Sequence, residues 1–193
     1  MGKKRLTGIL LVAVTLTLGA CGLTRKDTVA ETDTIETGMA ETSGIETNDA
    51  SVPFFPEFAS VDLEGTAIDS SIFANNKLTM INFWGTFCGP CIVEMPYLGK
   101  LAENMPEGVE LLGVIVDGEG NIDAANEILT EANASFRQIM PDEAIYQYCE
   151  RLIGVPTTIF VDREGKIIGE SLIGVRSEEA YRSEIESRLK EVE

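Results

Sequence analysis

The sequence predicts one α/β domain over about residues 53–193, in which helices flank a central mixed β-sheet. Two mainly apolar runs, 78–84 and 109–116, have the length and composition of buried strands. Segments with apolar residues at helical spacing follow these runs. Near the end of the chain, two further strand patterns meet at Asp162-Arg163-Glu164-Gly165, which is typical of a hairpin turn. Parallel crossovers together with a terminal hairpin imply a mixed sheet with helices on both faces.

The expected elements are justified in chain order by turn and capping residues. They are a hairpin of strands 58–63 and 67–72 with a turn at Glu64-Gly65, a strand at 78–84, a helix from 88–91 to 104, a strand at 109–116, a helix through 132, a short strand at 136–140, a helix at 142–152, strands at 157–161 and 166–173, and a final helix. Asn121 is expected to cap the helix that ends near Ala132, and Ser177 to cap the final helix. Acids in the first turn of the final helix suit its dipole.

Charge and composition exclude several classes of function. The 193 residues include 32 Asp or Glu and 15 Lys or Arg, for a net charge of −17. Without an excess of cations to displace counterions, nucleic acid is not an expected partner. The chain has no histidine, which excludes Ser-His-Asp and Cys-His catalysis and any His-ligated haem or zinc. The chemistry must therefore use cysteines, carboxylates, lysines or hydroxyls.

The N-terminus predicts an export signal with a lipid anchor. Residues 1–20 place basic residues before a mainly apolar run, too short for a membrane span, that ends in small residues. The tetrad Leu18-Gly19-Ala20-Cys21 resembles a bacterial lipobox, which implies that 1–20 are a lipoprotein signal peptide and that Cys21 is lipidated. The expected location is the bacterial cell envelope, on the outer face of the cytoplasmic membrane. The alternative is an ordinary signal peptide with an incidental cysteine.

After Cys21 the composition shifts to Thr, Glu, Ala, Gly and Asp, without any aromatic residue before Val52. Glu-Thr pairs recur every five residues, a period that matches neither a strand nor a helix. The few apolar residues cannot offset the entropy lost on ordering. Residues 21–52 are therefore expected to be the lipidated cysteine with a disordered acidic tether, and residues 53–193 the folded domain.

The chemistry is concentrated in the segment Trp84–Cys91. Here a buried strand leads into a Cys-x-x-Cys at the start of a helix, where unpaired N–H groups and the helix dipole favour a thiolate at Cys88. Pro90 suits the first helical turn, and Gly89 leaves the nucleophile uncovered. Cys88 is expected to attack a disulfide and Cys91 to resolve the mixed disulfide. Three alternatives remain, namely a zinc knuckle, a Cu(I) chaperone and a structural disulfide.

Two motifs identify the family that the domain resembles. The segment Asn82-Phe83-Trp84-Gly85-Thr86-Phe87-Cys88-Gly89-Pro90-Cys91, followed by Glu94-Met95-Pro96, is similar to the thioredoxin superfamily, and more closely to its TlpA/ResA-like branch of membrane-anchored thiol-disulfide oxidoreductases. Gly154–Asp162 resembles the second signature of that branch. The resemblance implies a thioredoxin-like fold with a central insertion at about 118–140. It also implies a cis Pro156 facing the dithiol, with Trp84, Gly89 and Pro90 as supporting residues.

The resemblance also bears on proton transfer. Thioredoxin has a buried Asp two positions before the Trp, where this chain has Asn82. The ResA-like branch instead has an acid three residues after the second cysteine, which is Glu94 here. Residues three apart share a helix face, so Glu94 is the candidate proton acceptor for Cys91, against the alternative of a surface acid. Cys149 is expected to be a small packing residue, with a third redox thiol as the alternative. Asp117-Gly118-Glu119 is interpreted as solvated surface.

The resulting hypothesis is an extracytoplasmic thiol-disulfide oxidoreductase that reduces client proteins and needs no cofactor or metal beyond its dithiol. The Gly-Pro dipeptide is that of thioredoxin, which is strongly reducing. The resemblance implies re-reduction by an integral-membrane thiol carrier. It also suggests, as clients, apocytochrome c, a methionine sulfoxide reductase or misoxidised proteins. The alternatives are a peroxiredoxin-like thiol peroxidase, whose Pro-x-x-x-Thr-x-x-Cys pattern is missing from the sequence, and a non-enzymatic Cu(I)-handling lipoprotein.

Overall fold

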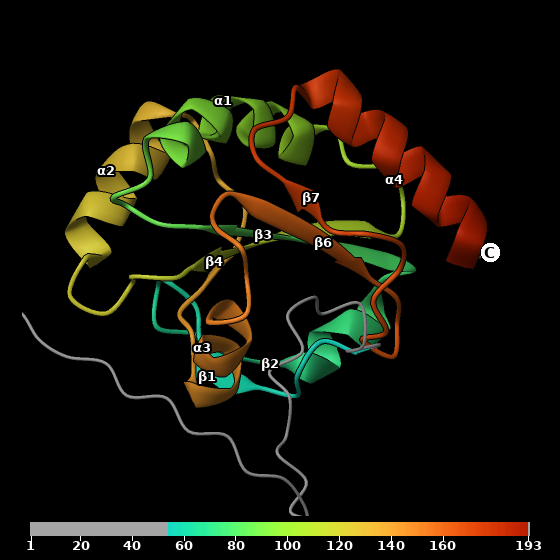
Figure 1. Ribbon diagram of the computed structural model, residues 1–193, viewed down its shortest axis with the longest axis horizontal. Coiled ribbons are helices and arrows are strands. Elements are labelled where there is room, and N and C mark those ends of the chain that lie inside the picture. Colours follow the sequence, from blue (N-terminus) through green and yellow to red (C-terminus); the bar gives the residue numbers. More distant parts are fainter. Residues whose placement is uncertain (1–53, 193) are drawn as a thin grey trace, which may run out of the picture. The chain divides into compact units, whose positions relative to one another are not determined.

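The computed structural model describes residues 54–192. The predicted signal peptide, Cys21 and the tether at 21–52 lie outside the described residues. The elements are β1 (Ala59–Val61), β2 (Ala67–Asp69), the 3-10 helix η1 (Ser70–Asn75), β3 (Leu78–Trp84), α1 (Gly89–Glu103), β4 (Val109–Ile115), α2 (Ile122–Glu131), β5 (Gln138–Ile139), α3 (Glu143–Cys149), β6 (Thr157–Val161), β7 (Leu172–Ile173) and α4 (Glu178–Val192) (Figure 1). No helix within 54–192 is both long and apolar enough to cross a membrane.

A mixed sheet of five strands forms the centre of the domain, in the order β5-β4-β3-β6-β7. β4 runs parallel to both β3 and β5, whereas β6 is antiparallel to β3 and β7. All seven residues of β3 are buried, as expected for a continuous apolar strand covered on both faces. The predicted mixed α/β sheet is confirmed. The predicted N-terminal hairpin is also present, as β1 paired with β2.

Alternate side chains of β3 enter two separate hydrophobic clusters. Leu78, Met80 and Trp84 belong to one cluster, and Ile81 and Phe83 belong to the other, as the two-residue period of a strand requires. Helices α1, α2 and α4 lie on one face of the sheet, and α3 lies on the other with the N-terminal hairpin (Figure 1). The helices therefore cover both faces, and α1 is held against the strand that precedes it.

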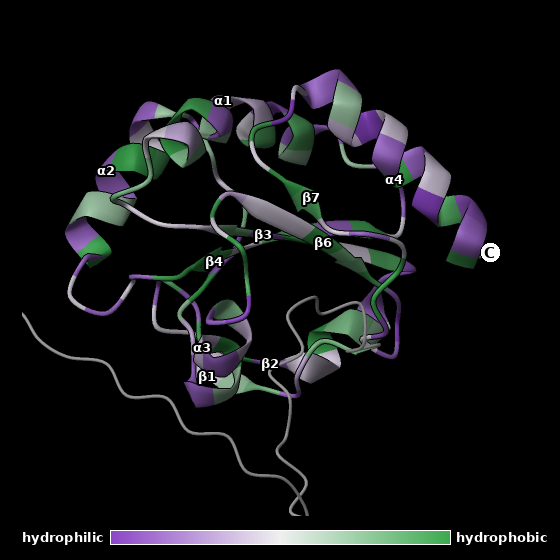
Figure 2. Cartoon of the chain, in the orientation of Figure 1, coloured by the Kyte–Doolittle hydropathy of each residue, from purple (hydrophilic) through white to green (hydrophobic). Residues whose placement is uncertain are grey.

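The final helix was predicted from its apolar stripe and its capping residue. α4 carries both hydrophilic and hydrophobic bands (Figure 2), and Tyr181 and Ile185 are fully buried against the sheet. The Ser177 hydroxyl accepts a hydrogen bond from the Ala180 N–H at 3.3 Å, so the predicted cap is confirmed. Asn121 precedes α2 as predicted but its side chain does not cap the helix. Its amide donates instead to the Asp117 carbonyl at 2.7 Å.

Several predicted strands are shorter than expected, including those at 58–63 and 136–140, which are reduced to β1 and β5. In two others the structure shows what ends the strand. The strand expected to reach Ile72 ends at Asp69, because the Asp69 carboxylate accepts from the Ser71 N–H at 2.9 Å and starts η1. The strand expected at 166–173 is reduced to β7 and one isolated bridge. Gly169 has a positive φ of 69°, which interrupts the extended backbone. The expected helix at 142–152 similarly ends at Cys149.

Candidate active site

The cysteine pair lies where the central strand leads into α1. β3 ends at Trp84, and Cys88 is the N-cap residue of the helix that begins at Gly89. Pro90 stands in the first turn, where its missing N–H leaves no helical hydrogen bond unmade. The sulfurs of Cys88 and Cys91 are joined in a disulfide of 2.08 Å. The structure therefore brings together the two cysteines that the sequence singled out.

The sulfur of Cys88 is in the better position to react. It accepts a hydrogen bond from the Cys91 N–H at 3.2 Å, and it lies at the positive end of the α1 dipole. Both interactions stabilise a thiolate at Cys88 once the disulfide is reduced. Cys88 is also 6% exposed, compared with 1% for Cys91. The arrangement is consistent with an attacking Cys88 and a buried resolving Cys91.

The loop before β6 lies against the nucleophile. The Val155–Pro156 peptide bond is cis, as the resemblance implied. The Cys88 sulfur lies 3.5 Å from the Val155 carbonyl oxygen, so the residue before Pro156 contacts the disulfide directly. The Pro156 carbonyl accepts from the Gly174 N–H at 2.8 Å. This bond ties the loop to the segment that leads into α4.

A shallow groove of about 430 Å³ opens beside the disulfide. It is lined by Phe87, Cys88, Gly89, Pro90, Val116, Cys149, Leu152, Gly154 and Val155. Phe87 is 70% exposed, and Ile153, which lies in the chain between the lining residues Leu152 and Gly154, is 83% exposed. Exposed apolar side chains that gather at one place are typical of surfaces that bind another molecule. The groove therefore gives a partner access to the Cys88 sulfur.

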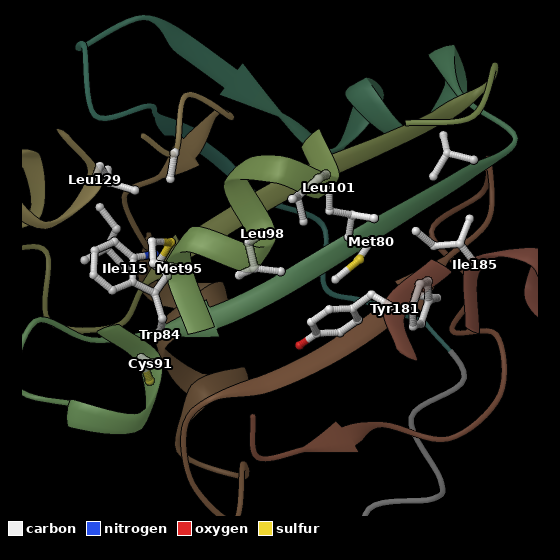
Figure 3. Packing of buried hydrophobic residues seen from close by; sticks show 14 of the residues in the cluster. Met80, Trp84, Cys91, Met95, Leu98, Leu101, Ile115, Leu129, Tyr181 and Ile185 are labelled. Atoms are coloured by element: carbon white, nitrogen blue, oxygen red, sulfur yellow. The ribbon is translucent and has the colours of Figure 1, made fainter. Parts of the chain in front are cut away.

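Trp84 has a buried partner that the sequence did not reveal. Its indole N–H donates to the Gln138 side-chain carbonyl at 2.9 Å, and both residues are buried. The Trp84 ring lies beside Met95 and Ile115, with Cys91 nearby in the same cluster (Figure 3). The hydrogen bond fixes the orientation of the ring beneath the disulfide. No local motif marks Gln138, because it comes from the edge strand β5.

Asp117 is a second residue that sequence reasoning missed. It was interpreted as solvated surface, but its carboxylate accepts from the Thr86 N–H at 2.9 Å and also from the Thr86 hydroxyl. These bonds hold the loop between β3 and α1. The signal for this role was present, because the carboxyl ends of the parallel strands β3 and β4 meet at one edge of the sheet.

Glu94 is fully buried on α1, not on the surface. One carboxylate oxygen, Oε1, accepts from the Tyr181 hydroxyl and from the Arg176 N–H, each at 2.7 Å. The other, Oε2, accepts from the Asn82 amide at 3.3 Å. Burial raises the pKa of Glu94 above its ordinary value, and the hydrogen bonds from Tyr181, Arg176 and Asn82 partly oppose this rise. A carboxyl group of this kind suits proton exchange nearer neutral pH.

Cys149 is a free, half-buried thiol at the end of α3. It packs against the cluster that contains Phe83 and lines the groove beside Cys88. Burial raises its pKa to about 12. The thiol is therefore protonated and weakly nucleophilic at neutral pH, which fits the predicted packing role.

Comparison with known proteins agrees with this geometry. Residues 49–187 match the Redoxin family. The thiol-disulfide oxidoreductase ResA of Bacillus thuringiensis subsp. konkukian (strain 97-27) is 33% identical over 140 residues, covering 71% of this chain and 75% of that protein. ResA of Bacillus subtilis (strain 168) is 30% identical over 114 residues, covering 58% and 62% of the two chains.

Solved structures show the same fold. A thiol:disulfide interchange protein of the thioredoxin family from Chlorobium tepidum TLS superposes with a TM-score of 0.60 at 21% identity, covering 74% of this chain and 99% of that chain. StoA from Bacillus subtilis gives a TM-score of 0.56 at 21% identity, covering 68% and 97%. Together with the Cys88–Cys91 disulfide, these relationships show that the chain belongs to the Redoxin family, as a ResA-like thiol-disulfide oxidoreductase of the thioredoxin superfamily.

Proposed function

We propose that this oxidoreductase is a lipid-anchored reductase of client-protein disulfides outside the cytoplasm, and that its dithiol needs no metal or cofactor. The position of Cys88 carries the proposal, because the sulfur lies at a helix N-terminus, accepts the Cys91 N–H and borders an apolar groove. A groove of this kind suits an extended client segment whose cysteine reaches Cys88. Apocytochrome c and methionine sulfoxide reductase are the client classes suggested by the family resemblance.

The reaction begins with the reduced enzyme. The Cys88 thiolate attacks one sulfur of the client disulfide, which forms a Cys88–client bond and releases the other client cysteine as a thiolate. Cys91 then loses its proton and attacks the Cys88 sulfur. This step forms the Cys88–Cys91 bond, breaks the mixed disulfide and releases the second client cysteine as a thiolate. The client gains two electrons, the enzyme loses two, and the client thiolates take protons from solvent.

We assign the proton of Cys91 to Glu94. Both side chains are buried on α1 and lie one turn apart, and the raised pKa of Glu94 favours acceptance of a proton. The carboxylate bonds to Asn82, Tyr181 and Arg176 in the oxidised form. Proton uptake at Glu94 would leave Cys91 as the thiolate that resolves the mixed disulfide.

The direction of electron flow follows from the residues between the cysteines. Gly89-Pro90 is the dipeptide of thioredoxin, whose potential of about −270 mV makes it a reductant. An integral-membrane thiol carrier would return electrons to the Cys88–Cys91 disulfide. Lipidation at Cys21 would keep the enzyme near that carrier, on the outer face of the cytoplasmic membrane. Labelling cells with a radioactive fatty acid, using Cys21→Ala as the control, tests the anchor.

A trapping experiment tests the central proposal. The Cys91→Ser variant should remain disulfide-linked to its client through Cys88, and mass spectrometry would name that client. The matched Cys88→Ser variant should trap nothing. The wild-type protein should also speed the reduction of a protein disulfide by dithiothreitol. No acceleration, together with stoichiometric Cu(I) uptake by the reduced protein, would favour a metal-handling lipoprotein instead.

A further inference from the structure

Glu94 belongs to a closed ring of hydrogen bonds whose members come from four elements. The Asn82 amide from β3 donates to Glu94 Oε2 at 3.3 Å and to the Thr158 hydroxyl oxygen from β6 at 3.0 Å. The Thr158 and Tyr181 hydroxyls lie 3.0 Å apart, and the Tyr181 hydroxyl from α4 donates to Glu94 Oε1 at 2.7 Å. All four side chains are fully buried. Solvent therefore does not compete for these bonds.

In this ring the hydrogen bonds are donated from Asn82 toward the Glu94 carboxylate, both directly and through Thr158 and Tyr181. Thr158 accepts from Asn82, so its own proton is available for Tyr181, and Tyr181 in turn gives its proton to Glu94 Oε1. Burial and the neighbouring carboxylate raise the pKa of Tyr181, so its hydroxyl stays protonated and remains a donor. Each hydroxyl proton and both amide protons then have an acceptor. This direction fits an ionised Glu94.

The unpaired oxygen of Asn82 indicates that its side-chain amide can take a second orientation. Asn82 Oδ1 is buried and has no hydrogen-bond partner among the residues that the structure describes. A half turn of the Asn82 amide would place this acceptor in front of Glu94 Oε2 and Thr158. The amide nitrogen would then occupy the position without a partner. The present orientation leaves one buried acceptor unpaired, whereas the turned amide leaves its two N–H donors unpaired, so the turned orientation is favoured only when Oε2 carries a proton.

The backbone decides which carboxylate oxygen takes the proton. Glu94 Oε1 is fixed as an acceptor by the Arg176 N–H at 2.7 Å, and a backbone donor cannot reverse. Oε2, which faces Asn82, is therefore the oxygen that can carry a proton. After the half turn, Oε2–H and the Thr158 hydroxyl both donate to Asn82 Oδ1, and the Tyr181 hydroxyl keeps its bond to Oε1. The contact between the Thr158 and Tyr181 oxygens then has no proton, so the ring opens at this contact when Glu94 is neutral.

We propose that Tyr181, Thr158 and Asn82 are positioning residues that set the proton affinity of Glu94, and that their hydrogen-bond ring is closed around the ionised carboxylate and opens when Glu94 takes the proton of Cys91. This proposal rests on the role assigned to Glu94 above. The proton moves from the Cys91 sulfur to the carboxylate, no other covalent bond forms or breaks, and within the ring only the Asn82 amide and the Thr158 hydroxyl turn. Besides the cysteines of α1, the titratable or charged groups that act on Glu94 are Tyr181 and Arg176.

The test is a Tyr181→Phe substitution, read by carbon NMR of glutamate labelled at its side-chain carboxyl. Loss of one donor to the carboxylate should move the Glu94 titration to higher pH. The resolution rate at the acidic end of the profile should fall about tenfold and approach wild type at alkaline pH. Thr158→Val removes the bonds to Tyr181 and Asn82 but neither of the bonds that these residues donate to Glu94, so it should give a smaller change in the same direction. Tyr97→Phe is the control, because it removes a half-exposed tyrosine hydroxyl from α1 outside the ring.

Glu94→Gln identifies the titrating signal and separates the two proposals. An unchanged or lower titration midpoint in both Tyr181→Phe and Thr158→Val would overturn the ring, whatever the activity of either protein. If the midpoint rises in both variants while Glu94→Gln resolves mixed disulfides at the wild-type rate, the ring is supported and the proton-acceptor role of Glu94 fails. The NMR measurement needs only the folded oxidised protein, so it does not depend on knowing a client.

Discussion

Two neighbouring sites near the start of helix α1, the Cys88 site and the Glu94 site, acquire their chemistry in different ways. At its first turn, the Cys88 sulfur accepts from the N–H of Cys91, three positions away. One turn further on, the Glu94 carboxylate is held by Asn82, Arg176 and Tyr181, which are 12, 82 and 87 positions away. The thiol site is thus built locally by the helix start. The carboxylate site exists only once β3, β6 and α4 have packed together.

This difference has a functional consequence. A helix N-terminus stabilises a thiolate wherever it occurs, so the nucleophile depends little on the rest of the domain. A buried carboxylate is costly unless several donors satisfy it. Proton transfer should therefore be the step that is most sensitive to distant substitutions, and the attack of Cys88 on a client the least sensitive.

Substitution of Glu94 by Gln should give the largest effect on a single step. The amide cannot accept the Cys91 proton, so resolution of the mixed disulfide should slow by about 100-fold, a typical loss for a general base. Formation of the mixed disulfide by Cys88 should keep its rate. Rapid-quench separation of the two steps measures both. Equal slowing of attack and resolution would show that the Cys88 site and the Glu94 site do not act separately.

The same substitution should act on stability in the opposite sense. Burial raises the pKa of Glu94 in the folded state, so the contribution of Glu94 to stability is greatest below the unfolded pKa of about 4.3 and is lost as pH rises through the folded pKa. Glu94→Gln should therefore gain stability relative to wild type over that range. Denaturant unfolding of both oxidised proteins at several pH values measures the difference. Parallel stability curves would show that Glu94 has no raised pKa.

The sequence predicted the Cys88 site far better than the Glu94 site. Trp84–Cys91 predicted the strand end, the helix start and the dithiol, because these depend on neighbours in the chain. The cis Val155–Pro156 bond came from the family resemblance. Glu94 also came from the family resemblance, supported by its spacing from Cys91 on the helix, but its donor Tyr181 was assigned only to an apolar stripe. The roles of Gln138 and Asp117 depend on which strands lie side by side, which a single sequence does not state.

Substitution of Asp117 tests whether a residue distant in the chain also stabilises the loop at the Cys88 site. Its carboxylate holds the backbone and hydroxyl of Thr86 in the loop before Cys88. Asp117→Ala should lower the free energy of unfolding by about 1–3 kcal/mol, because the Thr86 donors lose their acceptor. Asp117→Asn keeps one acceptor oxygen and should lose less. Similar unfolding energies for the two variants would mean that the loop does not need this acceptor.

Substitution of Cys149 should have the smallest effect, and its thiol is the control for the reactivity of Cys88. Cys88 caps the start of α1, whereas Cys149 is the last residue of α3, where the dipole disfavours a thiolate. Burial raises the pKa of Cys149 to about 12, although both residues line one groove. In the reduced protein at pH 7, iodoacetamide should modify Cys88 well before Cys149, as peptide mass spectrometry can follow. Cys149→Ala should leave the disulfide reductase rate unchanged. Alkylation of Cys149 as fast as Cys88 would show that the groove, and not the helix start, makes the thiol reactive.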